Sequence, residues 1–438
     1  MTHRLPLRGC TPVPLAHYLK ALGILRLIAE DKEHGDPEAT GHWEGEYFVL
    51  GSTLFSGDEE KDRAQLSHFF LQDYQPTAIL TPWNGRGGFL EGDEDDEDSE
   101  NRDDEGGRIG AQMLTVFRSS VHPRFEPLKQ IITAVSSNDV ITELNRARTE
   151  WKRLSAEAKN KKKRGEDLTD EDNEAVKRAK KKSDDLKRNL LSLLRNSLSD
   201  NATQWFDACQ VLWQDRSIAA PLLGQGGLDG STDFGVNYLR RLNELFDTNT
   251  GTARLQSEDW LSQSLFARQV FGLISKSPAD KKNVSPGQFL PFGTGGPNSG
   301  NVFEDEGKGK ALVNPWDYVL MLEGALLFSA AATKRLESSG SASLSYPFTV
   351  EPRFVGASST TYSDETPTKQ GAKRNAAEMW LPLWDHPTTL GELSALLREG
   401  RVTVGRRAAK DGLDFARAVG ALGVERGIAA LRFPHAFR

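Results

Sequence analysis

The sequence predicts an α+β fold that is predominantly helical, with a mixed N-terminal domain, a projecting antiparallel helical hairpin and a helical body with glycine-rich loops. Apolar residues recur at helical spacing through much of the chain, strand-like runs are short, and one long Lys/Arg/Glu/Leu-rich stretch is helical on both sides of a break. At 438 residues the chain is too long for one ordinary core. We therefore expect three parts, 1–137, 138–200 and 201–438, the last with a small β region.

The first part begins with a predicted helix. Pro14 suits a first helical turn, because the N–H that proline lacks would have no partner there, and apolar residues follow at helical spacing to Leu25. Residues 41–50 predict one strand, residues 64–74 a short amphipathic helix, and residues 77–81 (TAILT) a buried strand.

An acidic segment interrupts this part. Residues 91–107 hold eleven acidic side chains, one arginine and almost no apolar residue. Such a segment cannot bury enough surface to offset its ordering entropy, so we expect a disordered loop, with folded structure resuming at Ala111.

The charge of the chain is segregated. The formal net charge is −7, but without the acidic segment the remainder carries +3, and residues 146–195 hold seventeen Lys/Arg against ten Asp/Glu. A basic stretch of this kind can bind phosphate even on an acidic chain.

Residues 138–200 predict the hairpin. The break is at 164–169, and Thr169 followed by Asp172 resembles a capping box. Toward the break, apolar residues disappear and lysines dominate, so we expect the chain reversal to bring two basic clusters together as a phosphate-binding site, with a merely solvated hairpin as the alternative. The clusters are Lys161, Lys162, Lys163 and Arg164, and Lys177, Arg178, Lys180, Lys181 and Lys182.

The third part predicts helices at 205–271, interrupted by a glycine-rich loop, and at 316–336, where the strongly apolar composition predicts burial. Two short helices are expected at 390–398 and 415–422.

Three glycine-rich loops are candidate nucleic-acid contacts, at 83–89, 223–230 and 292–300. Glycine lets the backbone approach a ligand closely, and Asn, Gln and Arg beside it can hydrogen-bond phosphates or base edges. The alternative is a set of tight structural turns. The candidate residues are Trp83, Asn84 and Arg86; Gly224, Gln225, Gly226, Gly227 and Asp229, with Asn237 in the following helix; and Gly295, Gly296 and Asn298.

Enzyme signatures are missing from the sequence. The eight histidines form no HExxH and no Cys/His cluster, the glycine loops are followed by no Walker lysine, and there is no GxSxG. We expect no catalytic activity, metal or cofactor; a metal-dependent nuclease using scattered carboxylates is the alternative. With no apolar run of about 18 residues, no secretory signal, and Cys10 and Cys209 far apart, the expectation is a cytoplasmic protein with reduced thiols.

Six sequence blocks lie in order and are spread over nearly the whole chain. The blocks are LRGCTPVPLAHYLKALGILRLIAE, FFLQDYQPTAILTPWNGRGGF, LLGQGGLDGSTDF, VNPWDYVLMLEGALLFSAAATKRL, EMWLPLW and DGLDFARAVGALGVERGIAAL. Together they resemble one family, the large subunit of type I-G (formerly I-U) CRISPR Cascade, which is the eighth Cas family.

The resemblance implies a prokaryotic, non-catalytic subunit near the 5′ handle of the CRISPR RNA. It would read the protospacer-adjacent motif (PAM) in double-stranded target DNA, start strand separation and help recruit the Cas helicase-nuclease. Its other partners would be the backbone and remaining Cascade subunits and a small subunit. The alternative is a structural subunit that caps the handle without reading DNA.

Two departures from the family pattern concern these expectations. Leu228 stands where the family usually has Asn, which weakens a hydrogen-bonding role at that position. Members usually continue into a helical region resembling the small subunit, so either that region is a separate product here or this chain is a fragment.

Overall fold

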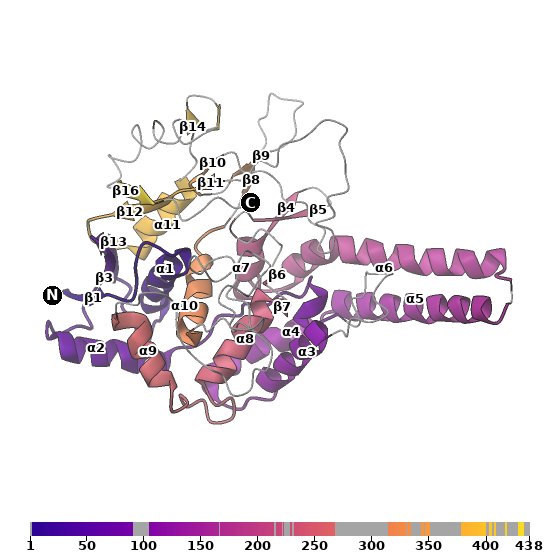
Figure 1. Ribbon diagram of the computed structural model, residues 1–438, viewed down its shortest axis with the longest axis horizontal. Helices are drawn as coiled ribbons and strands as arrows, with labels where there is room; N and C mark the ends of the chain where they lie inside the picture. Colours follow the sequence, from indigo (N-terminus) through magenta and orange to yellow (C-terminus); the bar gives the residue numbers. More distant parts are fainter. Residues whose placement is uncertain are drawn as a thin grey trace, which may run out of the picture.

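The computed structural model confirms an α+β fold that is predominantly helical (Figure 1). It describes residues 2–90, 105–165, 167–213, 216–220, 222, 228–229, 232–267, 314–329, 331–333, 343–345, 347–350, 378–399, 403–404, 407–408, 417 and 428–432.

The N-terminal residues form an antiparallel sheet with the strand order β1-β3-β2-β13. The strands are β1 (His3–Leu7), β2 (Thr40–Glu44), β3 (Tyr47–Ser52) and β13 (Thr388–Thr389). The single strand expected at 41–50 is therefore wrong. The chain turns at Gly45, whose φ of 58° lies in the left-handed region that glycine enters without strain, and two strands result.

Helix α1 (Leu15–Glu30) is buried on almost every side and packs on helix α10 (Pro315–Ala325). The two backbones touch at a pair of glycines: a Cβ on Gly23 would overlap the Leu320 carbonyl oxygen, and one on Gly324 would overlap the Leu19 carbonyl oxygen. Close approach of this kind requires residues without side chains.

Helix α10 is shorter than the expected 316–336. It ends at Ala325, and residues 331–333 form strand β8 (Ala331–Thr333), which pairs with β9 (Ser343–Ser345). Leu326 and Phe328 stay buried after the helix has ended. A continuous apolar run reports burial but does not by itself say where a helix stops.

Helix α2 (Glu59–His68) continues into a π-helical turn at Phe69–Asp73, close to the expected 64–74. The strand expected at 77–81 is wrong. These residues have no regular secondary structure. Ile79 and Leu80 are buried, but no described strand pairs with them. The segment packs against a turn instead, because a Cβ on Gly87 would overlap the Thr81 carbonyl oxygen.

Buried Arg124 joins this turn to the following helices. Its guanidinium donates to the carbonyl oxygens of Leu71 (2.6 Å), Gln72 (2.8 Å), Tyr74 (2.7 Å) and Gly251 (2.9 Å). Burial lowers the pKa of Arg124 to about 10. Four carbonyls take the place of water around the buried cation.

Two helices flank Arg124, α3 (Glu105–Arg118) and α4 (Glu126–Ser136). Because α3 starts at Glu105, the expected disorder of 91–107 is wrong for residues 105–107, and folded structure resumes six residues before Ala111. Residues 91–104 lie outside the described part of the chain.

The predicted hairpin projects from the body as two long antiparallel helices, α5 (Asp139–Lys163) and α6 (Asp170–Ser197) (Figure 1). The capping box is confirmed: the Thr169 hydroxyl accepts from the Asp172 N–H, and the Asp172 carboxylate accepts from the Thr169 N–H. At the base, Leu144 packs in the core with Leu190 and Leu194.

The body after the hairpin holds more strands than the expected run of helices at 205–271. A buried helix, α7 (Asp200–Cys209), leads into the antiparallel pair β4 (Gln210–Trp213) and β5 (Arg216–Ala219). The short pair β6 (Leu228–Asp229) and β7 (Thr232–Asp233) then leads to α8 (Phe234–Leu245) and α9 (Ser257–Phe266).

The C-terminal part contains the helix expected at 390–398 as α11 (Leu390–Glu399). Of the helix expected at 415–422, only Arg417 is described. The remaining strand pairs are β10 (Thr349–Val350) with β11 (Glu378–Met379), β12 (Leu381–Trp384) with β16 (Ile428–Arg432), and β14 (Thr403–Val404) with β15 (Arg407–Ala408).

Candidate nucleic-acid interface

The register of the hairpin is set by contacts along its whole length. At the base the Asn138 amide donates to the Ser197 hydroxyl (2.9 Å), and near the tip the Lys161 ammonium pairs with the Asp172 carboxylate (2.8 Å). Between them, the Lys180 ammonium lies over the Trp151 ring, 5.6 Å from its centroid.

This register separates the two basic clusters. Since Lys161 faces Asp172 and the helices run antiparallel, residues 177–182 lie opposite residues 151–156 rather than opposite 161–164. The cluster centres are offset by about nine residues, which is about 13 Å at a rise of about 1.5 Å per residue. The expectation that the chain reversal brings the two clusters together is wrong.

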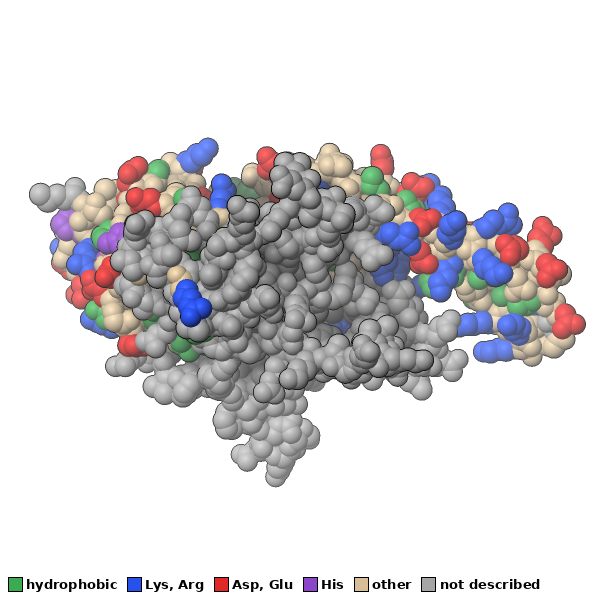
Figure 2. All heavy atoms as spheres, turned by 90° about the horizontal axis from the view of Figure 1, so that it is seen from above, with side chains coloured by type: hydrophobic (Ala, Val, Ile, Leu, Met, Phe, Trp, Pro, Cys, Tyr) green, Lys and Arg blue, Asp and Glu red, His purple; other side chains and the backbone are tan. Residues whose placement is uncertain are grey.

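Carboxylates occupy part of the predicted phosphate site. Lys161 pairs with Asp172, Lys177 with Glu174 (3.1 Å) and Lys182 with Glu143 (3.1 Å). The hydrogen bond from Lys161 lowers the pKa of the Asp172 carboxyl. Asp172 is one of three acidic residues in the first turn of α6, where the helix dipole stabilises negative charge. The same carboxylate neutralises part of the first basic cluster. Figure 2 shows Lys/Arg and Asp/Glu side chains mixed along the hairpin.

The other six predicted cations are not paired with a carboxylate of the described residues. Lys162, Lys163, Arg164 and Lys181 are exposed and form no ion pair with a described residue. Arg178 donates through Nε to the Glu174 carbonyl oxygen (3.3 Å), and Lys180 lies over Trp151. The sequence-predicted cations thus remain on the surface, but not as one site.

The loop at 83–89 is a turn built into the core. The Asn84 side chain caps a 3₁₀ turn (Gly85–Gly87) by accepting from the Arg86 N–H (3.1 Å), and it is buried. Gly88 has a φ of 83°. The half-buried Trp83 packs edge-on against Phe206, with ring centroids 5.0 Å apart.

Close backbone packing explains the glycines of this loop. A Cβ on Gly88 would overlap Gly110 and Ala111 of α3, and one on Gly110 would overlap the Arg86 carbonyl oxygen. Of the three residues predicted here as nucleic-acid contacts, Arg86 alone is exposed. Arg86 therefore lies on the surface, while Asn84 and Trp83 stabilise the turn and its packing.

The other glycine-loop candidates are mostly not placed. Residues 223–227 and 292–300 lie outside the described part of the chain, and with them Gly224, Gln225, Gly226, Gly227, Gly295, Gly296 and Asn298. Asp229 lies in strand β6. Asn237 is fully buried in α8, so its side chain does not reach the surface.

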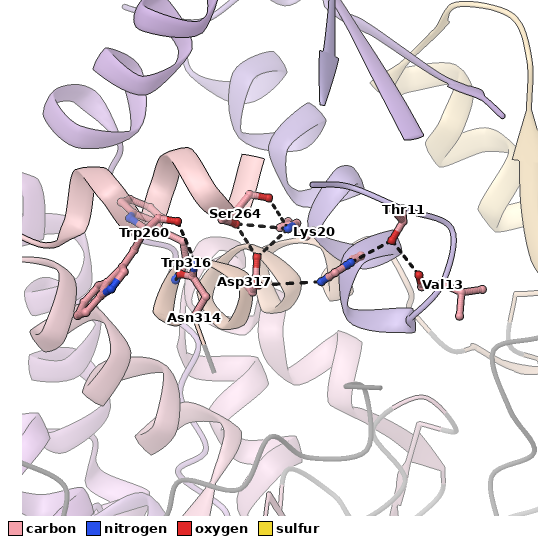
Figure 3. A network of polar contacts seen from close by, with 9 residues as sticks. Thr11, Val13, Lys20, Trp260, Ser264, Asn314, Trp316 and Asp317 are labelled. Atoms are coloured by element: carbon pink, nitrogen blue, oxygen red, sulfur yellow. Dashed lines mark hydrogen bonds and ion pairs between the residues drawn. The ribbon is translucent and has the colours of Figure 1, made fainter. Parts of the chain in front are cut away.

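A buried polar network that sequence reasoning missed holds α1 against α10 (Figure 3). The Lys20 ammonium pairs with the Asp317 carboxylate (2.7 Å) and donates to the Ser264 carbonyl oxygen (2.6 Å), while the Ser264 hydroxyl donates to the same carboxylate (2.5 Å). His17 lies beside them, with Nε2 4.0 Å from the Asp317 carboxylate.

A second ion pair repeats the arrangement six residues further along both helices. Arg26 pairs with Glu323, whose carboxylate also accepts from the hydroxyls of Tyr74 and Tyr238 (2.6 Å each). All four charged residues stand singly within mostly apolar helical runs. The one sequence signal for these ion pairs is a charged residue on a helix face that is predicted to be buried.

Within the described ranges no three His, Cys, Asp or Glu side chains gather so as to hold a metal ion. Cys10 and Cys209 are buried free thiols, and burial raises the pKa of Cys10 to about 12. No described helix is long and apolar enough to cross a membrane.

The blocks that carry the family resemblance meet in the core. The first (α1) packs on the fourth (α10), the second contributes Tyr74, and Tyr18 of the first donates to the Pro382 carbonyl oxygen of the fifth (3.0 Å). Strand β12 of the fifth pairs with β16, which is largely in the sixth. The resemblance therefore lies mainly in residues that build the fold.

Comparison with known proteins adds no relative: no protein-family model matches this chain, and no curated protein matches its sequence.

Proposed function

We propose that this chain is the large subunit of a type I-G CRISPR RNA-guided surveillance complex. It binds duplex DNA beside the target, recognises the PAM, starts unwinding and helps recruit the Cas helicase-nuclease. The observation that carries the proposal is the set of six sequence blocks, in order, that resemble this family. The subunit itself is not an enzyme in this proposal, and base pairing between guide and target supplies most of the specificity.

The architecture supports this role in two respects. The six blocks all contribute residues to one packed core, as a shared architecture requires. The basic hairpin and the exposed Arg86 are the surface features that suit DNA. Arg is the side chain that most often reads guanine in the major groove, and a lysine-bearing hairpin suits phosphates.

The test compares assembled complexes with and without this subunit. Matched target duplexes that differ only in the base pairs flanking the target are titrated against each complex. The proposal expects the subunit to confer a preference among flanks. An equal gain in affinity for every flank would contradict motif recognition.

One observation favours a second candidate, a subunit that caps the CRISPR RNA 5′ handle without reading DNA. In the turn at 83–89, Asn84 is buried and Trp83 packs on Phe206, so the turn has a complete structural explanation. In the same titration this candidate gives equal affinities across flanks, and removing the subunit exposes the handle to ribonuclease.

A further inference from the structure

Helix α5 separates its charges onto two sides. Glu143, Glu150 and Glu157 are spaced seven residues apart and therefore follow one stripe of the helix. Lys152 and Lys159 are also seven apart, and each lies two residues after a glutamate. At about 100° per residue they lie about 160° around the helix from the glutamates.

The glutamate side is neutralised within the protein. Arg153 pairs with Glu150 (2.8 Å) and Glu157 (2.7 Å), and Lys182 of α6 reaches across the hairpin to Glu143 (3.1 Å). Side chains on this side already satisfy one another, and the side offers little net charge to a partner.

The opposite side carries lysines that have no such partners. No ion pair joins a described residue to Lys152, Lys159 or Lys162. Lys162 lies three residues after Lys159, and both of these lysines are exposed. Lys180 joins them, because it lies two residues before Lys182 and so points away from the glutamate side. These four residues are called the lysine flank.

The lysine flank has the form of a binding surface for a polyanion. Lys152 and Lys162 are ten residues apart on one straight helix, so the cations extend over about 15 Å. None of the eight residues of α5 at 145, 148, 149, 152, 155, 156, 159 and 162, which share this side, is acidic. On α5, a row of ammonium groups without carboxylates suits an evenly charged partner such as a phosphate backbone. On α6, Asp184 lies four residues after Lys180 and is the acidic residue next to that lysine.

The absence of stacking surface favours a duplex over a single strand. Proteins hold single strands largely by stacking bases on aromatic rings. Trp151 is the one aromatic residue between 138 and 200, and its ring lies under Lys180. The hairpin therefore offers cations but no stacking platform.

We propose that the lysine flank, rather than the two basic clusters acting as one site, binds the phosphate backbone of duplex DNA. This rests on the proposed function for its biological setting, but the site is defined by the hairpin alone. Lys152 and Lys159 are binding residues in this proposal, and the glutamate side faces away from the duplex.

The test uses two variants of the full chain that carry the same change in net charge. In the first, Lys152, Lys159 and Lys162 are replaced by Gln; in the control, Arg153, Lys182 and Arg188, which are ion-paired, are replaced by Gln. Circular dichroism checks that both remain helical. Affinity for a duplex without a target sequence is then measured over a range of salt concentrations.

The lysine-flank variant is expected to reduce the slope of log affinity against log salt, while the control keeps the slope. The reduction is about 0.9 for each phosphate that the variant no longer neutralises, so up to about 3 for three lysines. Equal reductions in both variants, an unchanged slope in the lysine-flank variant, or wild-type binding without salt dependence would each overturn the proposal. Tighter binding of a single strand, with the same dependence on these lysines, would overturn the choice of a duplex.

The outcomes separate this site from the proposed function. If the slope changes as expected but the subunit confers no preference among flanks in the assembled complex, the DNA site stands and the PAM reader lies in another chain. If the preference among flanks depends on the subunit but the slope is unaffected, the proposed function stands and the lysine flank is only solvated.

Discussion

The Lys20 ammonium and the Asp317 carboxylate form a buried ion pair at 2.7 Å, although 297 residues separate them in the sequence. Neither side chain is more than 1% exposed. The pair joins α1 to α10 in the core. Each charge compensates the other, so neither is buried without a partner of opposite charge.

Replacing one partner of this pair should strongly destabilise the protein. Asp317→Leu leaves the Lys20 ammonium with the Ser264 oxygens alone, and removing one member of a buried pair costs about 3 to 5 kcal/mol. The double variant Lys20→Met with Asp317→Leu should recover most of that stability, because no unpaired charge remains. Denaturant unfolding measures the difference, and a double variant no more stable than the single one would contradict this account.

The contact between α1 and α10 should tolerate no side chain at its glycines. Gly23→Ala and Gly324→Ala each place a methyl group inside the radius of a backbone carbonyl oxygen, and overpacking of this kind costs about 1 to 3 kcal/mol. Gly391→Ala in α11 is the matched control, since its nearest neighbour would be the Thr389 hydroxyl at 4.0 Å. Thermal melting should show a lower midpoint for the first two and an unchanged or higher one for the control.

His17 should make stability depend on pH. Burial, and then the charge of Lys20, lower the pKa of His17 from 6.5 to about 3. Between these values the unfolded chain binds a proton that the folded chain excludes, so stability falls as the pH falls, by up to about 1.4 kcal/mol per pH unit.

The variant His17→Gln isolates this contribution. It cannot take up the proton, so its free energy of unfolding should decline less steeply than that of the wild type between pH 6.5 and about 3, while Asp317 and Lys20 stay in place. His34→Gln, at a half-exposed histidine on the surface, serves as the control. Parallel curves for His17→Gln and wild type would contradict this account, because they would show that folding does not change proton uptake by His17.

Arg86→Ala should alter the preference of the assembled complex among flanking base pairs. If Arg86 reads a base edge, its removal should reduce discrimination at one position by about 1 to 3 kcal/mol and leave the other positions unchanged. Lys61→Ala, which removes an exposed cation on α2, should leave the preference intact. A uniform decrease in affinity for Arg86→Ala would mean that Arg86 contacts the backbone and that the reader lies elsewhere.

The hairpin was predictable because its signals are local. Helical periodicity, the break at 164–169 and the Thr169–Asp172 capping box all lie within a few residues of what they determine. Its register is not local. Which residue of α5 faces which residue of α6 depends on packing between the helices, and the prediction that the clusters meet at the tip was wrong for that reason.

The candidate site divides in the same way. That residues 161–164 and 177–182 are strongly basic follows from their composition. That Lys161 and Lys182 are already paired required the partners from the other arm of the hairpin, Asp172 and Glu143. Likewise the exposure of Arg86 and the burial of Asn84 depend on α3, which packs against their turn.

By itself the sequence determined the helical class of the fold, the hairpin and its cap, and the segregation of charge, because these follow from spacing and composition along the chain. Only the tertiary structure decided which glycines are contact points, which charges are neutralised and which remain available. Those outcomes depend on partners as distant as Lys20 and Asp317, and no local pattern specifies a partner 297 residues away.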